Sequence, residues 1–352
     1  MRRKREQLWM TLVQAGLVQG EAFEMGKPDS PWYVKVLLAI SGWLAALFLL
    51  GFIGVGFDFV FKNSSVAFII GCLMIGGAFA LLGRSKNEFV EHVALALSLA
   101  GQALVGLAIF DISGHHEAIV WLLVALVQVL LGLLMPNFVH RIFSTFVATF
   151  AVSMALTHLR EPYTISSVVM FLAAWCWLNE FRYPQQMRKI QAIGYGFILA
   201  LIQQTGAGML GFGPSHHLTE IWVKPWIGEG LTGAVALFVV WQLLQRYGQT
   251  ILSRRSIEAL LGTFLLCLVS MKVQGLTVGM VIIMLGFVST NRILLGLGIV
   301  SLLFCISGYY YRLDATLLAK SQNLFLVGLV LLALRWVIIS GLTVNKNEVK
   351  HA

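Results

Sequence analysis

Four glutamines lie inside long apolar segments, where a polar side chain could bind another helix or a solute. Gln102, Gln128 and the pair Gln203–Gln204 fall near the middle of three long apolar segments. An amide in hydrocarbon needs a hydrogen-bond partner, because its polar groups are costly to bury unpaired. Two interpretations follow. The glutamines either bond neighbouring helices together, or they line a polar path for a small or amphipathic solute.

Arg335 is a further polar residue in an apolar setting, within LVLLALRWVIISG. An arginine at the centre of a membrane helix costs about 2.5–3.5 kcal/mol on insertion scales. Arg335 is about 6 residues, or roughly 9 Å, from the expected end of its segment. Either its long side chain reaches the lipid headgroups, or it has a partner inside the protein. We group it with the four glutamines as the candidate polar interior.

The acidic residues avoid the middles of the apolar segments. Asp58, Glu91, Glu180 and Glu258 all stand near segment ends. Ion-coupled carriers keep carboxylates deep in the bundle, so this distribution argues against a proton-driven pump. The sequence also has no glycine-rich phosphate loop, nucleophile elbow or HExxH motif. We therefore expect a protein that is not an enzyme and that uses no cofactor.

Most of the eight histidines fall in links that the topology below places on one side of the membrane: His115, His116, His158, His216 and His217. Imidazole, together with nearby carboxylates, can ligate zinc or copper. Adjacent histidines are not a standard ligand spacing, and no CxxC pair accompanies them. We expect solvated polar links and no metal site.

The apolar segments that carry these residues are long enough to cross a membrane. The chain has 352 residues, of which 58% are hydrophobic and 12% charged, against about 25% charged in soluble domains. Apolar stretches of about 18 residues or more predict membrane helices. We predict an all-α, polytopic helix bundle of about twelve spans: 33–56, 65–83, 89–110, 117–135, 141–158, 164–180, 191–209, 230–246, 256–272, 275–290, 292–311 and 323–341.

The positive charge of the chain sets its expected orientation. The net charge is +9, but the lysines and arginines are spread over short links, which is typical of topology signals and not of nucleic-acid binding. With the N-terminus inside, most of them face the cytoplasm, so we predict N-in, C-in. Three parts follow: a cytoplasmic segment 1–32 with a short amphipathic helix, the transmembrane bundle 33–341, and a cytoplasmic tail 342–352.

Two features of the links complete this topology. The longest link, 210–229, carries Trp222 and Trp226 around Pro225. Tryptophan favours the headgroup layer, so this link is expected to lie in the outer membrane surface. All seven prolines are expected to lie outside the spans.

A dense polar and aromatic link follows the eleventh predicted span, in GYYYRLDATLLAKS, residues 308–321. Tyrosine suits the membrane surface, because its ring is apolar and its hydroxyl is wet. An aromatic belt with interface charges therefore explains the composition of this link. It does not require this order of residues.

That order resembles the end of a bacterial inner-membrane family catalogued as a domain of unknown function. The start of the chain is also similar to it, in LWMTLVQAGLVQGEAF (8–23) and PWYVKVLLAISGWLAALFLLGFIG (31–54). Members of the family are typically associated with small membrane-anchored proteins that bear a GDYxxLxY motif. The resemblance implies a bacterial inner-membrane location and a protein partner. It brings no established activity, substrate or catalytic residue.

The leading hypothesis is a non-enzymatic component of a membrane complex with a small anchored partner. The docking surface is predicted to comprise Tyr309, Tyr310, Tyr311, Arg312, Asp314 and Lys320, with rings and charges setting specificity. The alternative is a transporter or lipid-handling protein, in which the glutamines line the path. The lipid bilayer is an expected partner in both cases.

Overall fold

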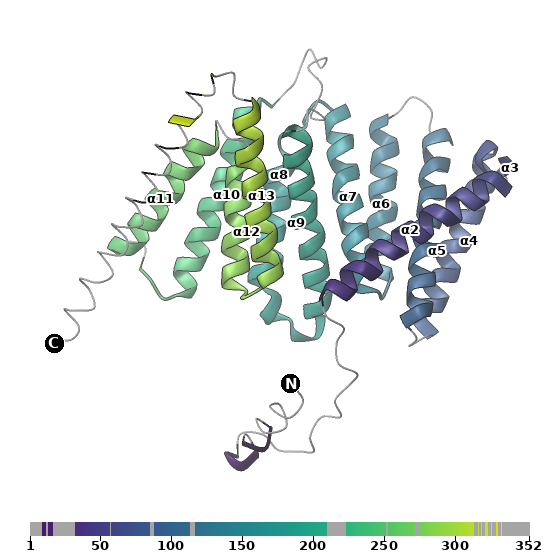
Figure 1. Cartoon of the computed structure of the whole chain (residues 1–352), viewed down its shortest axis with the longest axis horizontal. Helices are drawn as coiled ribbons and strands as arrows, with labels where there is room; N and C mark the ends of the chain where they lie inside the picture. The colour runs from purple at the N-terminus through teal and green to yellow at the C-terminus, as the bar shows by residue number, and fades with distance from the viewer. Residues whose placement is uncertain are drawn as a thin grey trace.

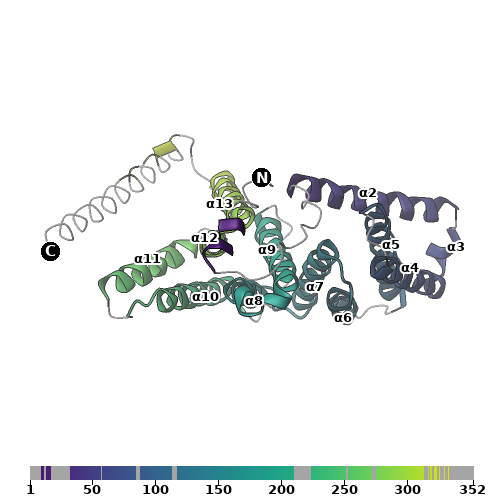
Figure 2. The ribbon, with the colours of Figure 1, turned by 90° about the horizontal axis from the view of Figure 1, so that it is seen from below.

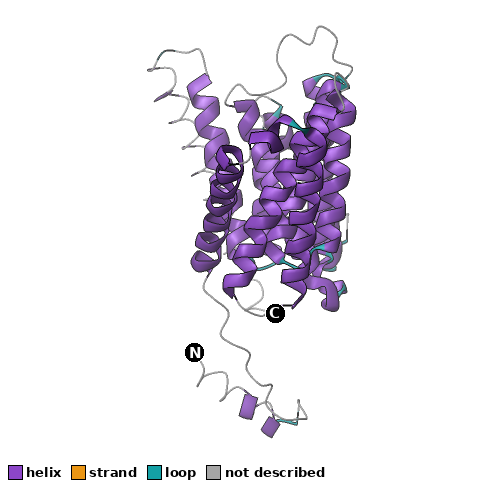
Figure 3. Ribbon diagram, turned by 90° about the vertical axis from the view of Figure 1, so that its right-hand side faces the viewer, coloured by secondary structure: helices purple, strands orange, loops and turns teal. Residues whose placement is uncertain are grey.

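The computed structural model of the chain describes residues 9–11, 13–16, 32–56, 58–84, 88–112, 117–209, 223–250, 253–271 and 275–312, with a few isolated positions up to 332. Helices account for nearly all of these residues, and no strand occurs among them (Figure 1). Most of the helices run roughly parallel or antiparallel to one another, while α2 lies obliquely (Figures 1 and 3). The predicted all-α class is therefore confirmed.

The helix bounds follow the apolar segments of the sequence. In chain order the helices are α2 (Trp32–Gly56), α3 (Asp58–Lys62), α4 (Ser64–Arg84), α5 (Glu88–Ile112), α6 (Glu117–Leu134), α7 (Phe138–His158), α8 (Ile165–Leu178), the short 3-10 helices η1 (Glu180–Arg182) and η2 (Pro184–Gln186), α9 (Met187–Met209), α10 (Pro225–Arg246), α11 (Arg254–Ser270), α12 (Leu276–Val288) and α13 (Arg292–Arg312). Every predicted span from 33–56 to 292–311 coincides with one of these helices, give or take a few residues. The predicted span 323–341 lies outside the fully described ranges.

Among the described residues, six helices are long and apolar enough to cross a membrane: Ser64–Arg84, Val90–Ile112, Glu117–Leu134, Phe138–His158, Pro225–Arg246 and Arg292–Tyr311. The helices α8, α11 and α12 are apolar but shorter. A multi-pass membrane protein is the class that this set of helices indicates. The count of about twelve spans and the N-in, C-in orientation stay predictions.

The start of α10 corrects two expectations. Pro225 is the first residue of α10, where a missing backbone N–H costs nothing because first-turn donors have no helical acceptor. Trp226 therefore stands exposed in the first turn of this helix and not in a link. The expectation that every proline lies outside the spans was wrong at Pro225, and Trp222 lies outside the described residues.

The helices form two groups, which we call the N-terminal group (α2 to α5) and the C-terminal group (α6 to α13). In the first, α4 packs along α5 and α2 crosses α5 obliquely (Figures 1 and 2). In the second, α7 packs on both α6 and α9, while α12 packs on α13. The backbones of α5 and α6 approach each other much less than those of α6 and α7 do. Side chains must therefore provide much of the connection between the groups.

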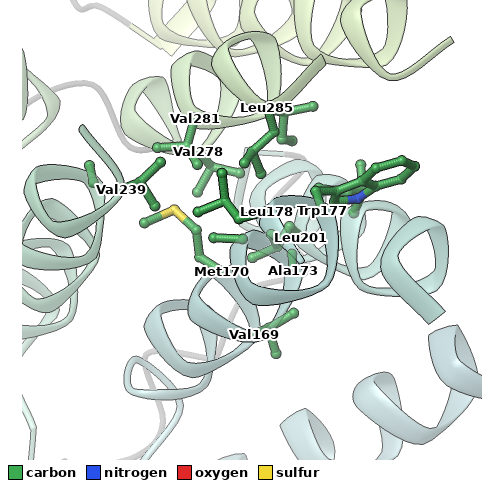
Figure 4. Packing of buried hydrophobic residues seen from close by; sticks show 14 of the residues in the cluster. Val169, Met170, Ala173, Trp177, Leu178, Leu201, Val239, Val278, Val281 and Leu285 are labelled. Atoms are coloured by element: carbon green, nitrogen blue, oxygen red, sulfur yellow. The ribbon is translucent and has the colours of Figure 1, made fainter. Parts of the chain in front are cut away.

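The largest apolar core belongs to the C-terminal group. Met170 and Leu178 of α8, Val239 of α10, and Val281 and Leu285 of α12 meet there and are almost inaccessible (Figure 4). Lipid tails are as apolar as these side chains, so in a bilayer such helices are held by close packing more than by removal of water. Small residues at helix contacts strengthen that packing.

Glycine provides the closest of these contacts. A Cβ atom placed on Gly71 of α4 would lie 2.7 Å from the carbonyl oxygen of Gly101 in α5, and the same distance holds in reverse. A Cβ atom on Gly286 of α12 would lie 2.5 Å from the backbone nitrogen of Leu295 in α13. At these positions two helix backbones touch, and no larger residue fits without a shift of a whole helix.

Candidate functional site

Five polar side chains form one hydrogen-bonded cluster between α5, α6 and α7. They are Ser98 and Gln102 of α5, Gln128 of α6, and His140 and Ser144 of α7, and we call them the His140 cluster. His140, Ser98 and Ser144 are 0% exposed, and the two glutamines are 6% and 5% exposed. A polar group sequestered to this degree costs several kcal/mol in hydrocarbon unless it is paired.

His140 is the centre of the cluster. Its Nε2 lies 2.8 Å from Ser98 Oγ and 2.8 Å from Gln102 Nε2, and its Nδ1 lies 3.2 Å from Ser144 Oγ. The amide nitrogen of Gln102 donates, so His140 Nε2 accepts, which places the proton of the neutral ring on Nδ1. Gln102 Nε2 also donates to Ser98 Oγ at 3.1 Å. Both ring nitrogens are thereby engaged.

Gln128 extends the cluster to α6, and one of its own acceptor atoms has no partner among the described residues. Its Nε2 donates to Gln102 Oε1 at 3.0 Å. Its own Oε1 is buried and has no hydrogen-bond partner among the described residues. A buried carbonyl oxygen of this kind is a place for a water molecule or another donor. Gln102 and Gln128, expected to need partners in hydrocarbon, are thus partners of each other across two helices.

Local sequence holds His140 in position. Asn137 is the N-cap of α7 and its side chain accepts from the backbone N–H of His140 at 3.1 Å. Arg141 is also buried, and it donates from Nε to Gly132 O and from Nη2 to Met135 O, both at 2.8 Å. These two carbonyls lie in the last turn of α6 and just after it, where carbonyls lack helical partners. Arg141 therefore ties α6 to α7 and is not a freely solvated link residue.

The cluster lies at the contact between the two helix groups. Val139 and Phe143 of α7 pack against the apolar cluster that contains Leu95 and Leu99 of α5. The polar contacts of Ser98 and Gln102 with His140 join the same two helices. These hydrogen bonds fix the register of α5 against α7, because a shift of either helix would break them.

Gln203 and Gln204 are not part of this cluster. They lie on α9, where Ser166 Oγ of α8 donates to Gln204 Oε1 at 3.0 Å. Gln203 Oε1 and Gln204 Nε2 are buried and lack a partner within the described ranges. Arg335 lies outside the described residues. The structure therefore joins Gln102 with Gln128, and it places the other two glutamines on a separate pair of helices.

Glu229 is a polar residue that the sequence reasoning assigned to a link. It lies in the second turn of α10, and its carboxylate accepts from Ser270 Oγ of α11 at 3.3 Å. Ser270 Oγ in turn accepts from the backbone N–H of Thr277 at 3.3 Å. The longer α10 makes Glu229 a helix-to-helix contact. Pro225 itself was the available signal, because proline is favoured at the first position of a helix.

The tyrosines form the end of α13. Tyr311 is 80% exposed and Tyr309 is 36% exposed, while Tyr310 is half-buried and its ring meets that of Tyr311 edge-on at 5.8 Å. The backbone of Arg312 closes the helix. Asp314 and Lys320 lie outside the described residues. Of the predicted docking residues, the structure thus places the three tyrosines and the backbone of Arg312 on one helix end.

Of the five histidines considered as metal ligands, the structure describes His158. Within the described ranges, no group of three or more His, Cys, Asp or Glu side chains could hold a metal ion. His158 Nδ1 lies 2.8 Å from Glu117 Oε2 in an exposed pair. His115, His116, His216 and His217 lie outside the described residues.

Glu180 lies outside the membrane-spanning helices, in the turn η1 between α8 and α9. It is 2% exposed, and Gln191 Nε2 donates to its Oε2 at 3.0 Å. Burial raises the pKa of the Glu180 carboxyl above its ordinary value, and the hydrogen bond from Gln191 opposes that shift. The folded protein therefore binds the Glu180 proton more tightly than the unfolded chain does.

This pKa shift predicts a pH dependence of stability. The contribution of Glu180 to the free energy of unfolding is most favourable below the ordinary pKa of 4.5. It falls as the pH rises from there through the raised pKa of the folded state. We expect Glu180→Gln to remove this decline, as measured by detergent unfolding at about pH 4 and about pH 7. Equal pH differences in variant and wild type would contradict the assignment.

Long apolar helices that enclose a hydrogen-bonded polar cluster indicate the class of this protein, which is an all-helical, multi-pass membrane protein. Most polar groups of the cluster are paired across helices, with Gln128 Oε1 as the exception within the described ranges.

The chain belongs to the family described as Domain of unknown function (DUF4401), whose model matches residues 31–339. That match confirms the resemblance to a domain of unknown function: it covers 31–54, 308–321 and the helices between them, and it leaves out the segment 8–23. No curated protein and no solved structure matches the chain.

Proposed function

We propose that this protein is a non-enzymatic component of a membrane complex in a bacterial inner membrane, and that it binds a small membrane-anchored protein along α13. The observation that carries the proposal is the 80% exposure of Tyr311 at the end of this helix. Tyrosine is enriched among the residues that dominate binding energy, because a large ring is ordered at little entropic cost.

The exposed face of α13 leads directly to Tyr311. Val300 is 63% exposed and Leu303 is 58% exposed, and Ser307 follows them on the same side. The spacing of these positions puts all of them and Tyr311 on one stripe of the helix. The opposite stripe is buried and consists of Leu294, Gly298, Ser301 and Cys305.

This stripe fits the anchor helix of a small partner. Its middle is apolar, and Ser307 is small enough to let another helix approach closely. Tyr309 and Tyr311 stand at its end, where a partner chain would leave the membrane. The hydrogen bonds of the His140 cluster fit a structural role, because they join three helices.

A second candidate function is the transport or handling of a small or amphipathic solute. The buried atoms Gln128 Oε1, Gln203 Oε1 and Gln204 Nε2, which lack partners among the described residues, favour it. Such atoms can exchange partners with a passing polar solute.

We expect Tyr311→Ala to lower the amount of co-purified partner by about tenfold, because it removes the most exposed ring of the stripe. The measurement is native mass spectrometry of the protein purified from its own membrane in mild detergent.

The matched control is Tyr247→Ala, since Tyr247 is 64% exposed at the end of α10. Unchanged partner binding in the Tyr311 variant would remove the docking assignment. A wild-type chain that carries no partner would favour the second candidate.

A further inference from the structure

An apolar groove runs along the outside of α10 and α11. Its volume is about 760 Å³, and its walls are formed by Leu237, Phe238 and Trp241 of α10 and by Ile257, Leu261 and Phe264 of α11. The wall of α11 extends over roughly 10 Å from Ile257 to Phe264, at 1.5 Å per residue. The groove is therefore long enough for a good part of an acyl chain, and its side chains offer that chain hydrocarbon contacts.

Aromatic contacts fix the shape of this groove. The ring of Phe238 lies 5.6 Å from that of Phe171 in α8 and 5.7 Å from that of Trp241. Phe238 also lines a second apolar groove of about 360 Å³ between α8 and α10. Rings that support one another in this way keep the groove formed, which lowers the entropic cost of filling it.

A cation stands at one end of the groove. Arg254, Ile257, Leu261 and Phe264 follow the spacing i, i+3, i+7, i+10, so all four lie on one stripe of α11. The Arg254 side chain is 93% exposed. Its Nε donates to Glu258 Oε1 at 2.9 Å, which directs the side chain and leaves the N–H groups of both Nη atoms to other acceptors.

The facing helix offers a second donor at the same end. Phe238, Trp241 and Gln245 follow the spacing i, i+3, i+7 on α10. Gln245 is exposed, next to the end of α10 at Arg246. The amide of Gln245 and the guanidinium of Arg254 therefore lie at the same end of the groove, just beyond its apolar walls.

We propose that this groove is a binding site for an anionic phospholipid, with one acyl chain along Phe238, Trp241 and Leu261 and the phosphate on Arg254 and Gln245. The charge pattern selects this occupant. The walls are apolar throughout, and Arg254 and Gln245 lie at the end where a lipid headgroup would lie, with Glu258 holding one side of the guanidinium. Arginine is well suited to phosphate because its N–H groups form a planar fork. Basic pockets between membrane helices commonly recognise anionic headgroups.

The test compares two lipids with identical acyl chains, phosphatidylglycerol and phosphatidylcholine. The full-length protein is stripped of lipid in detergent and offered both lipids in equal amounts. Native mass spectrometry then gives the ratio of the two bound species. We expect wild type to favour phosphatidylglycerol, and Arg254→Gln to reduce that preference by about fivefold, the effect of one cation near a headgroup.

Two further variants separate a built site from general attraction to positive charge. Leu261→Trp fills the groove without changing any charge, and it is expected to reduce phosphatidylglycerol binding as well. Arg182→Gln removes an exposed arginine of η1, away from the groove walls, and is expected to leave the ratio unchanged. Equal binding of both lipids by wild type overturns the proposal. So does an Arg254→Gln variant that keeps the wild-type ratio, or an equal loss in Arg254→Gln and Arg182→Gln.

Discussion

Replacing His140 by alanine is expected to lower the free energy of unfolding by about 3 kcal/mol. The substitution removes a side chain that is 0% exposed. It leaves Gln102 Nε2, Ser98 Oγ and Ser144 Oγ without the imidazole. Each buried polar group left unpaired costs about 1–3 kcal/mol, and the emptied volume adds a packing loss. Rearrangement of the remaining hydrogen bonds recovers part of this cost.

The control for this substitution lies at the other end of the same helix. His158→Ala removes an exposed contact with Glu117, and exposed contacts of this kind are worth about 0–1 kcal/mol. Reversible unfolding in mixed micelles measures both variants, and Ser98→Ala with His140→Ala forms a double-mutant cycle that isolates the hydrogen bond from the packing loss. If His140→Ala lowers the free energy of unfolding no more than His158→Ala does, the His140 cluster does not hold α5, α6 and α7 together.

Gly286→Ala is expected to lower the free energy of unfolding by about 2–3 kcal/mol. The new Cβ would lie 2.5 Å from Leu295 N and 2.8 Å from Leu295 Cα. Both are backbone atoms, so no side-chain rotation relieves the clash. The helices α12 and α13 must separate, and their packing is among the closest in the molecule.

Gly296→Ala is the matched control for Gly286→Ala. Gly296 lies within α13, and a Cβ on it would meet nothing within 4 Å. Alanine favours the helix over glycine by about 0.5–1 kcal/mol, so this variant is expected to be neutral or slightly more stable. The comparison uses thermal unfolding in the same detergent. An equal effect of the two substitutions would show that α12 and α13 are not in backbone contact.

The helices of this protein could be predicted from sequence, because each apolar segment is long and ends at polar residues. The cost of burying an amide also predicted that Gln102 needs a partner. The identity of that partner could not be predicted, since Gln128 lies 26 residues away and only the packing of α5 on α6 and α7 brings the two together. Segment hydropathy contains no information about which helices are neighbours.

His140 was missed for a local reason. The apolar pattern placed the start of its span at residue 141, which left His140 just outside the predicted helix. Asn137 was the available signal, because asparagine is a preferred N-cap and a helix that begins at Phe138 includes His140. Glu229 was missed in the same way, since its helix begins one turn before the apolar run. Apolar runs underestimate helices whose first turns are polar.

The residues of the His140 cluster lie far apart in the sequence, so they enter the membrane at different times during synthesis. Gln102 precedes His140 by 38 residues, which is about 2–8 s of synthesis at about 5–20 residues per second. During that interval the bond from Gln102 to Ser98 within α5 is available, but the acceptor on α7 has not yet left the ribosome. The α5 helix therefore enters the bilayer with its amide incompletely paired. Its bonds to α6 and α7 form only after those helices have been inserted.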